Sequence, residues 1–279
     1  MVEESILNVF CPGNFRGFYF ALFLKKFYHR EKEKKMKELL SQAADNVIFL
    51  LQFFGVIALM FLIAYVSEKI AGRRQGERKI FTVRKIAMVG VFSAIAAVLM
   101  LIEIPMPFAP SFYKLDLSEL PALICSFAMG PVAGVMVEFC KIILKLLIKG
   151  TTTAFVGELA NFTVGCAFIL PTAVMYCFKK TKKTAIIGCV VGTVVLTVFG
   201  SAFNGIYLLP KFAQIYGMDL DAIIAMGTAI NPAITSVSTF VVFAVAPLNL
   251  IKGVVDSAIT ILIYKKISVL IHRVLDNQQ

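Results

Sequence analysis

The sequence lacks the motifs that most enzymes and ATPases use. It contains no G-x-x-x-x-G-K-[ST] run, whose backbone amides would cradle nucleotide phosphates, and no H-E-x-x-H pair for zinc. The two histidines, His29 and His272, stand near the chain ends, so a serine–histidine pair cannot form within the hydrophobic segments. The sequence therefore predicts a protein that is not an enzyme and has no ATPase site of its own.

Cysteine pairs at metal-binding or redox spacing are also missing. The six cysteines form no C-x-x-C pair, and five of them lie in or beside apolar segments. Thiols in such places are usually buried and unpaired. We therefore expect no metal site and no disulfide framework at these positions, which are Cys11, Cys125, Cys140, Cys166, Cys177 and Cys189.

Apolar side chains dominate the composition. They make up 59% of the 279 residues, and the mean hydropathy is +0.84. These values are typical of an integral membrane protein. Since one span takes about 20 residues, the chain has room for roughly six or seven helices and for no separate soluble domain.

Seven hydrophobic segments define the expected all-α architecture. The final segment exceeds one span, and Pro247 is expected to divide it, because proline favours a helix start. We therefore predict a final helix at 247–265 and a long external loop at 210–246, part of which dips into the membrane or caps the protein. Residues 105–118 are predicted to form an external loop, with Asp116 or Ser118 capping the short helix that follows. The segments are 47–66, 86–104, 117–129, 131–148, 158–178, 185–209 and 236–264.

The net charge of +11 indicates membrane orientation. Basic residues cluster at 69–85, at 179–183 and in the tail, which places these regions inside the cell and the loops 105–117, 149–157 and 210–246 outside. The basic stretch 25–37 would then lie outside, against this rule. Residues 1–46 are therefore expected to be an N-terminal extension, with Met36 as an alternative start and 47–66 as an extra transmembrane helix.

Three polar residues in the last segment indicate a site within the membrane. Asn249, Lys252 and Asp256 fall on one face of a helix. Charged side chains inside a membrane persist where they face the protein interior or a cavity and have partners. The residues are interpreted either as a structural Lys252–Asp256 ion pair or as a polar binding site in which Asp256 holds Lys252.

Further polar positions are expected at the same outer level of the membrane. Asn161 and Asn204 lie at the outer ends of their predicted helices, and Asp116 lies in the adjoining loop. Convergence of polar groups from several helices is typical of a small-molecule pocket. Lys141 is equally well interpreted as a ligand contact or as the partner of Glu138, three residues before it.

Small residues line one face of the segment 86–104. Gly90 and Ala94, and likewise Ser93 and Ala97, are four residues apart, a spacing that permits close helix contact. This face either packs within the chain or docks onto another membrane protein.

These motifs resemble those of the riboflavin-binding S components of energy-coupling factor (ECF) transporters. The resemblance covers about residues 80–270 and predicts an S-component membrane domain at 80–272, with six core helices. The stretches that carry it are 93–96, 105–108, 115–121, 130–134, 160–162, Asn204 with 208–210, and 247–253.

The resemblance implies a multi-pass subunit of a prokaryotic plasma membrane that captures riboflavin from outside. Its partners would be two ATPases and a T component, and the T component would dock at Gly90, Ser93, Ala94 and Ala97. Riboflavin would be the transported ligand, with FMN or analogues as possible further ligands, and no cofactor is implied. The implied binding residues are Leu115, Asp116, Leu117, Lys141, Asn161, Asn204, Asn249 and Lys252.

Two alternatives stay open. One is an S component for another vitamin, such as thiamine or pantothenate. The other is a stand-alone, ion-coupled secondary transporter in which Lys252 and Asp256 relay a proton.

Overall fold

The computed structural model describes residues 47–75, 81–151 and 153–276. Contacts divide the chain into two units, Met1–Gln52 and Phe53–Gln279. Of the first unit, only the start of one helix is described. The predicted extension 1–46 and the alternative start at Met36 therefore lie outside the described residues, as does Cys11.

Every predicted hydrophobic segment is helical. Among the residues that the structure describes, five stretches are long and apolar enough to cross a membrane: Leu51–Arg73, Val83–Leu101, Val156–Phe178, Lys182–Tyr216 and Val237–Ile263. The chain is thus a multi-pass helical protein, whereas the expected count of six core helices plus one is not confirmed. In chain order, the described helices begin with α3 (Val47–Gln75), α4 (Val83–Leu101), α5 (Glu119–Met129), α6 (Pro131–Lys149) and α7 (Val156–Phe178).

The predicted loop 210–246 and the predicted helix start at Pro247 are wrong. The helix α8 (Lys182–Phe203) continues through the π-helical turn η2 (Asn204–Leu208) into α9 (Leu209–Tyr216). After α10 (Leu220–Thr228), a second continuous helix runs through α11 (Val237–Phe240), the π-helical turn η3 (Val241–Val245) and α12 (Ala246–Asp276). Its first turn is fixed by a capping box between Ser236 and Thr239.

The two π-helical turns explain how proline is tolerated inside these helices. The amide of Leu209 donates to the carbonyl of Asn204 immediately before Pro210, and the amide of Ala246 donates to the carbonyl of Val241 immediately before Pro247. In a regular α-helix a proline ring clashes with the carbonyl four residues earlier and leaves it without a donor. A widened turn relieves both problems, so the helix continues past the proline.

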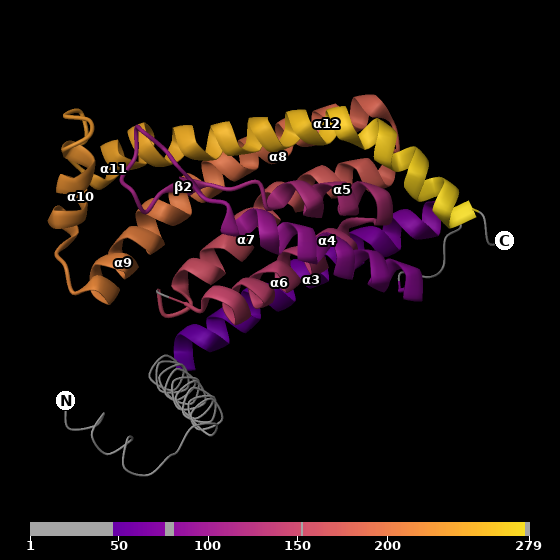
Figure 1. The fold of residues 1–279 in the computed structure, drawn as a ribbon, viewed down its shortest axis with the longest axis horizontal. Helices are drawn as coiled ribbons and strands as arrows, with labels where there is room; N and C mark the ends of the chain where they lie inside the picture. Colours follow the sequence, from indigo (N-terminus) through magenta and orange to yellow (C-terminus); the bar gives the residue numbers. More distant parts are fainter. Residues whose placement is uncertain (1–46, 76–80, 152, 277–279) are drawn as a thin grey trace, which may run out of the picture. The chain divides into compact units, whose positions relative to one another are not determined.

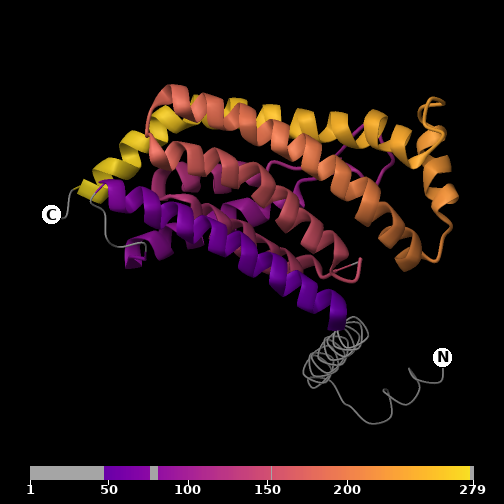
Figure 2. The same cartoon turned by 180° about the vertical axis from the view of Figure 1, so that it is seen from behind.

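The short helix α5 lies among four longer helices of the second unit. It contacts α4, α6, α7 and α12, while α8 packs against both α7 and α12. Both views show α8 and α12 side by side over most of their lengths (Figures 1 and 2). The core around α5 is apolar and includes Ala122, Leu123, Phe168 and Ile169, all fully or almost fully buried.

Within the second unit, Glu68 attaches α3 to its neighbours. One oxygen of its carboxylate accepts from Lys85 Nζ of α4, and the other accepts from the Val132 amide at the start of α6 at 2.9 Å. An anionic group at a helix N-terminus accepts a hydrogen bond from a free amide and interacts favourably with the positive end of the helix dipole. Ile57 and Ala64 are buried in one cluster with residues of α6 and α7, while most of the helix is exposed, so the predicted extra helix contacts the bundle along one face.

The loop between α4 and α5 contains a short antiparallel ladder. Strand β1 (Ile104–Pro105) pairs with β2 (Lys114–Leu115), with Ile104 opposite Leu115. The chain then reaches the N-cap Ser118, whose amide donates to Asp116 Oδ1 at 2.9 Å. This arrangement brings Asp116 to the start of α5.

Candidate functional site

A cavity of about 710 Å³ lies at the end of the bundle that carries the β1–β2 loop. Its volume is in the range of small-molecule sites. The loop between α4 and α5, the adjacent ends of α6 and α7, and the helices α8 to α10 and α12 all contribute to its lining.

Five of the eight predicted binding residues line this cavity. Asn161 comes from α7, and the others come from the loop, from η2 and from α12. Leu115 and Lys141 are buried outside the lining, and Leu117 is half-buried outside it. The role of these three as ligand contacts stays a prediction. The five lining residues are Asp116, Asn161, Asn204, Asn249 and Lys252.

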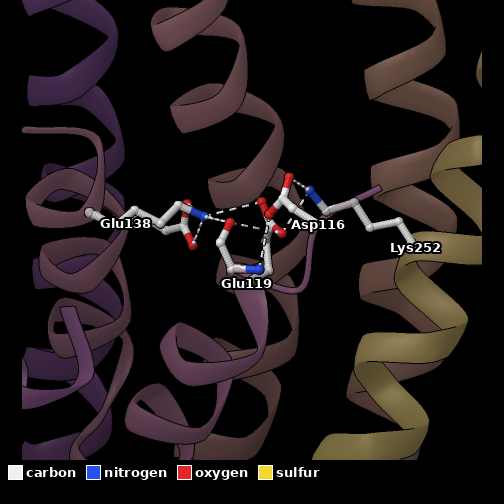
Figure 3. A network of polar contacts seen from close by, with 6 residues as sticks. Asp116, Glu119, Glu138 and Lys252 are labelled. Carbon is white, nitrogen blue, oxygen red and sulfur yellow. Dashed lines mark hydrogen bonds and ion pairs between the residues drawn. The ribbon is translucent and has the colours of Figure 1, made fainter. Parts of the chain in front are cut away.

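A buried ionic network forms the floor of the cavity near α12. Lys252 Nζ lies 3.2 Å from Asp116 Oδ2 and 2.7 Å from Glu119 Oε2. Figure 3 shows Lys252 reaching this pair from one side and Glu138 approaching from the other. Because Asp116 precedes α5 and Lys252 lies on α12, the network ties the loop to the final helix.

Lys141 is the second cation of the network. Its Nζ lies 2.8 Å from Glu138 Oε2 and 3.2 Å from Glu119 Oε1, and it donates to Ser118 Oγ at 2.9 Å. The sequence left open whether Lys141 contacts the ligand or pairs with Glu138, and the structure shows the pair. Lys141 therefore pairs with Glu119, which lines the cavity, while Lys141 itself lies outside the lining.

Asp116 remains ionised despite its burial. Burial acts to raise the pKa of this loop carboxyl, but the charges of Lys252 and Lys141 and the hydrogen bonds from Ser118 hold the pKa below its ordinary value. An ionised Asp116 is what the contact with Lys252 requires.

The predicted Lys252–Asp256 ion pair is absent from the described structure. Lys252 turns toward the loop instead, and both carboxylate oxygens of the fully buried Asp256 have no hydrogen-bond partner. The i, i+4 spacing correctly placed the two on one face. It could not show that Asp116 and Glu119, distant in sequence, compete for the same ammonium group.

Asn204 and Asn249 differ in what they can offer to a ligand. Asn204 is held within the chain, since Tyr113 donates to its Oδ1 at 2.8 Å and its Nδ2 donates to the Gly200 carbonyl at 3.0 Å. Asn249 is buried, yet its Nδ2 has no partner. An unsatisfied buried donor is costly, so Asn249 is a ready hydrogen-bond donor for a ligand.

A second set of ion pairs stands at the other side of the cavity. Lys145 Nζ lies 2.5 Å from the buried Glu158, which also accepts from Thr151 and Thr153. Glu158 therefore holds Lys145 at the lining of the cavity.

Glu103 joins the loop to α6. It pairs with Lys114 at 2.5 Å and with Lys149 at 3.1 Å. Its partial burial acts to raise its pKa, but the hydrogen bonds and charges of the two lysines lower it overall.

Part of the apolar lining comes from the region mistaken for a loop. Sequence reasoning missed it because Pro210 and Pro247 suggested chain breaks. Two signals pointed to helices: Gly217, which ends α9 in a left-handed conformation, and Asp219 at the N-cap of α10. The apolar lining residues of α9 and of 218–226 are Phe212, Tyr216, Met218, Ile223 and Met226.

The predicted docking face on α4 separates into two sides. Gly90 and Ala94 are exposed, and a Cβ atom built on Gly90 would meet no other atom within 4 Å. Ser93 and Ala97 are buried within the chain, at 3% and 2% exposure, and are not accessible to a partner. Only half of the expected face can therefore dock.

This site suits a ligand with an apolar body and several polar atoms. Amide, ammonium and carboxylate groups line the cavity together with aromatic and aliphatic side chains. Within the described ranges, no group of three or more His, Cys, Asp or Glu side chains could hold a metal ion.

Comparison with known proteins supports this description. The family model described as "ECF transporter, substrate-specific component" matches residues 84–264. The chain is 34% identical to the riboflavin transporter FmnP of Bacillus subtilis, covering 66% of this chain and 92% of that protein. It is 33% identical to the riboflavin transporter RibU of Staphylococcus aureus, covering 68% and 94%.

A solved structure described as the S component of a bacterial ECF transporter is also similar. The TM-score is 0.53 at 34% sequence identity, and the match covers 67% of this chain and 96% of that one. The fold and the sequence thus lead to the same relatives.

Proposed function

The chain belongs to the family of substrate-specific components of ECF transporters, and we propose that it captures riboflavin outside the cell for uptake. The relatives that are riboflavin transporters match over 92% and 94% of their lengths. The observation that carries the proposal is that Asp116, Asn161, Asn249 and Lys252 line one cavity with apolar walls.

Riboflavin has the chemistry that this cavity can accommodate. Its ring is flat and largely apolar, with carbonyl oxygens and nitrogens at one edge, and its ribityl chain carries hydroxyls. The free Nδ2 of Asn249 can donate to such an acceptor, and the half-buried Asn161 offers both a donor and an acceptor. Leu196, Leu208 and Leu248 supply apolar surface for the ring.

Purification offers a direct test. Protein isolated from cells grown with riboflavin should be yellow, and the ligand-free protein should quench riboflavin fluorescence at micromolar concentration. Thiamine and pantothenate serve as competitors, since both are vitamins that alternative S components would take. A colourless protein that leaves riboflavin fluorescence unchanged, or whose quenching thiamine or pantothenate abolishes, would refute this substrate.

We further propose that uptake requires a T component and two ATPase subunits, and that the protein acts in a prokaryotic plasma membrane. The family match supports the partnership. The exposed Gly90 and Ala94 of α4 support a docking surface for the T component, because small residues permit close helix contact. A secondary transporter would instead function alone.

A further inference from the structure

Asp256 differs from every other buried carboxyl group described in the bundle. Its exposure is 0%, and neither of its oxygens has a hydrogen-bond partner. It lies on α12, which packs against α5 and α8. An ionised carboxylate without a partner in such a place costs several kcal/mol, so the observed surroundings favour a neutral group.

The balance of charges in the ionic network also favours a neutral Asp256. Four buried carboxyl groups, Asp116, Glu119, Glu138 and Asp256, stand against two ammonium groups, Lys141 and Lys252. Three of the carboxyl groups contact an ammonium group and Asp256 does not. If every group were ionised, the network would carry excess negative charge in a low-dielectric region.

Lys252 has a second possible partner on its own helix. Asp256 lies four residues further along α12, a spacing at which an ion pair forms readily. In the described structure Lys252 is instead paired with Asp116 and Glu119, the residues that begin α5 and end the loop. The ammonium group can therefore pair either with Asp116 and Glu119 or with Asp256. Which pairing forms depends on whether Asp256 is charged.

We propose that Asp256 is a proton-binding site: with its proton bound, Lys252 holds the loop over the cavity, and when the proton leaves, Lys252 moves to Asp256 and releases the loop. The proton passes from the carboxyl oxygen to water, and the negative charge that remains is neutralised by Lys252. Asp116 keeps its hydrogen bond from the Ser118 amide, and Glu119 keeps its contact with Lys141. The site does not depend on which substrate occupies the cavity.

The neighbours of Asp256 fit a protonated carboxyl group. Thr260, four residues further along α12, is fully buried and its hydroxyl also has no partner, so its oxygen is free to accept a hydrogen bond from a protonated carboxyl group. Opposite, α8 contributes Thr193, whose hydroxyl meets that of Ser257 at 3.3 Å. The charged groups that act on Asp256 come from α5, α6, the loop and α12 itself: Glu119, Lys141, Asp116 and Lys252.

Infrared spectroscopy tests the proton directly. Purified wild-type protein at neutral pH should show the carbonyl stretch of a protonated carboxyl group, and Asp256→Asn should lack that component. Asp221→Asn removes an exposed carboxyl group of α10 and should leave the band unchanged. A wild-type spectrum that Asp256→Asn does not alter in this region would overturn the proposal.

Hydrogen exchange tests the movement of Lys252. After correction for intrinsic rates, amides of residues 105–118 should lose protection in the wild type between neutral pH and about pH 9. Asp256→Asn cannot attract Lys252 and should keep this protection. Equal protection in the two proteins at both pH values would show that Asp256 does not control the loop.

A metal cation is the competing occupant. If Asp256 were ionised and bound sodium, the melting temperature of the wild type would rise with sodium chloride but not with choline chloride, and Asp256→Asn would lose the difference. That result would replace the proton by sodium. Equal melting temperatures in the two salts are expected from a protonated group.

Discussion

The contribution of single residues to the cavity is clearest at Asn249 and Lys252. We expect Asn249→Ala or Lys252→Ala to weaken riboflavin binding by about 1–3 kcal/mol, because each change leaves a buried polar atom of the bound ligand without its hydrogen-bond partner. Fluorescence titration measures the change. The matched control is Lys183→Ala, an exposed lysine near the start of α8, which should bind as the wild type does. If Asn249→Ala bound riboflavin unchanged, its free amide would not be a ligand contact.

Acidification should reveal the charge of Asp116. Its pKa in the folded protein lies below the ordinary value of 3.8, so its ionised form contributes stability above that value and loses it as the pH falls through the folded-state pKa. The melting temperature should therefore drop on acidification below about pH 4. Asp116→Asn should be less stable at neutral pH and show a smaller drop. A drop of the same size in both proteins would assign the acid sensitivity to another group.

Residue patterns predicted which groups face the cavity better than which groups pair. Helical spacing placed Asn249, Lys252 and Asp256 on one face, and sequence correctly indicated the Glu138–Lys141 pair as one of two possibilities. The Lys252–Asp116 contact joins positions 136 residues apart, so no local pattern could indicate it. Competition among several carboxylates for one ammonium group is decided only by the tertiary arrangement.

At the scale of helices, close approach between α8 and α12 depends on Gly253. A Cβ atom there would lie 2.8 Å from Thr193 Cγ2 and 3.1 Å from Leu196 Cδ2. Gly253→Ala should therefore push the helices apart and destabilise the protein by about 1–3 kcal/mol, the usual cost of overpacking. Gly90→Ala is the control, because that position is open. Thermal melting in one detergent compares the two, and equal melting temperatures would contradict this reading.

Helix positions were predictable from hydrophobicity, whereas helix ends were less so. The starts of α4 and α8 are set by Thr82 and Thr181, each of which accepts a hydrogen bond from the amide three residues later. Pro210 and Pro247 led to wrong helix ends, because whether a proline ends a helix depends on the geometry of the turn before it. Hydrophobic pattern reports burial and length, but it does not report a widened turn.

At the scale of the whole molecule, capture and transport should be separable. Gly90→Leu should bind riboflavin as the wild type does, because Gly90 is exposed and is not part of the cavity lining, yet it should impair uptake by obstructing the docking surface. Loss of binding in this variant would show that the α4 face serves the fold instead.

The energy source provides a second test at this scale. Uptake of labelled riboflavin should disappear in cells without the ATPase subunits, while binding by membranes from the same cells should persist. Undiminished uptake there would favour a secondary transporter. The family was predictable because its motifs lie in the chain in order, but the partners themselves are not visible in one chain.

The two π-helical turns have a consequence for how related sequences compare. They lie against each other, and a Cβ atom on Gly205 of η2 would come within 2.9 Å of Val241 of η3. Each turn accommodates one residue more than a regular helix of the same span, so removing that residue, such as the exposed Val242, should restore a regular helix and keep the flanking helical faces in register. A homologue without such a turn would therefore align only with a one-residue gap inside a membrane helix, at 204–208 or 241–245, where an aligner assuming uninterrupted helices would misplace it.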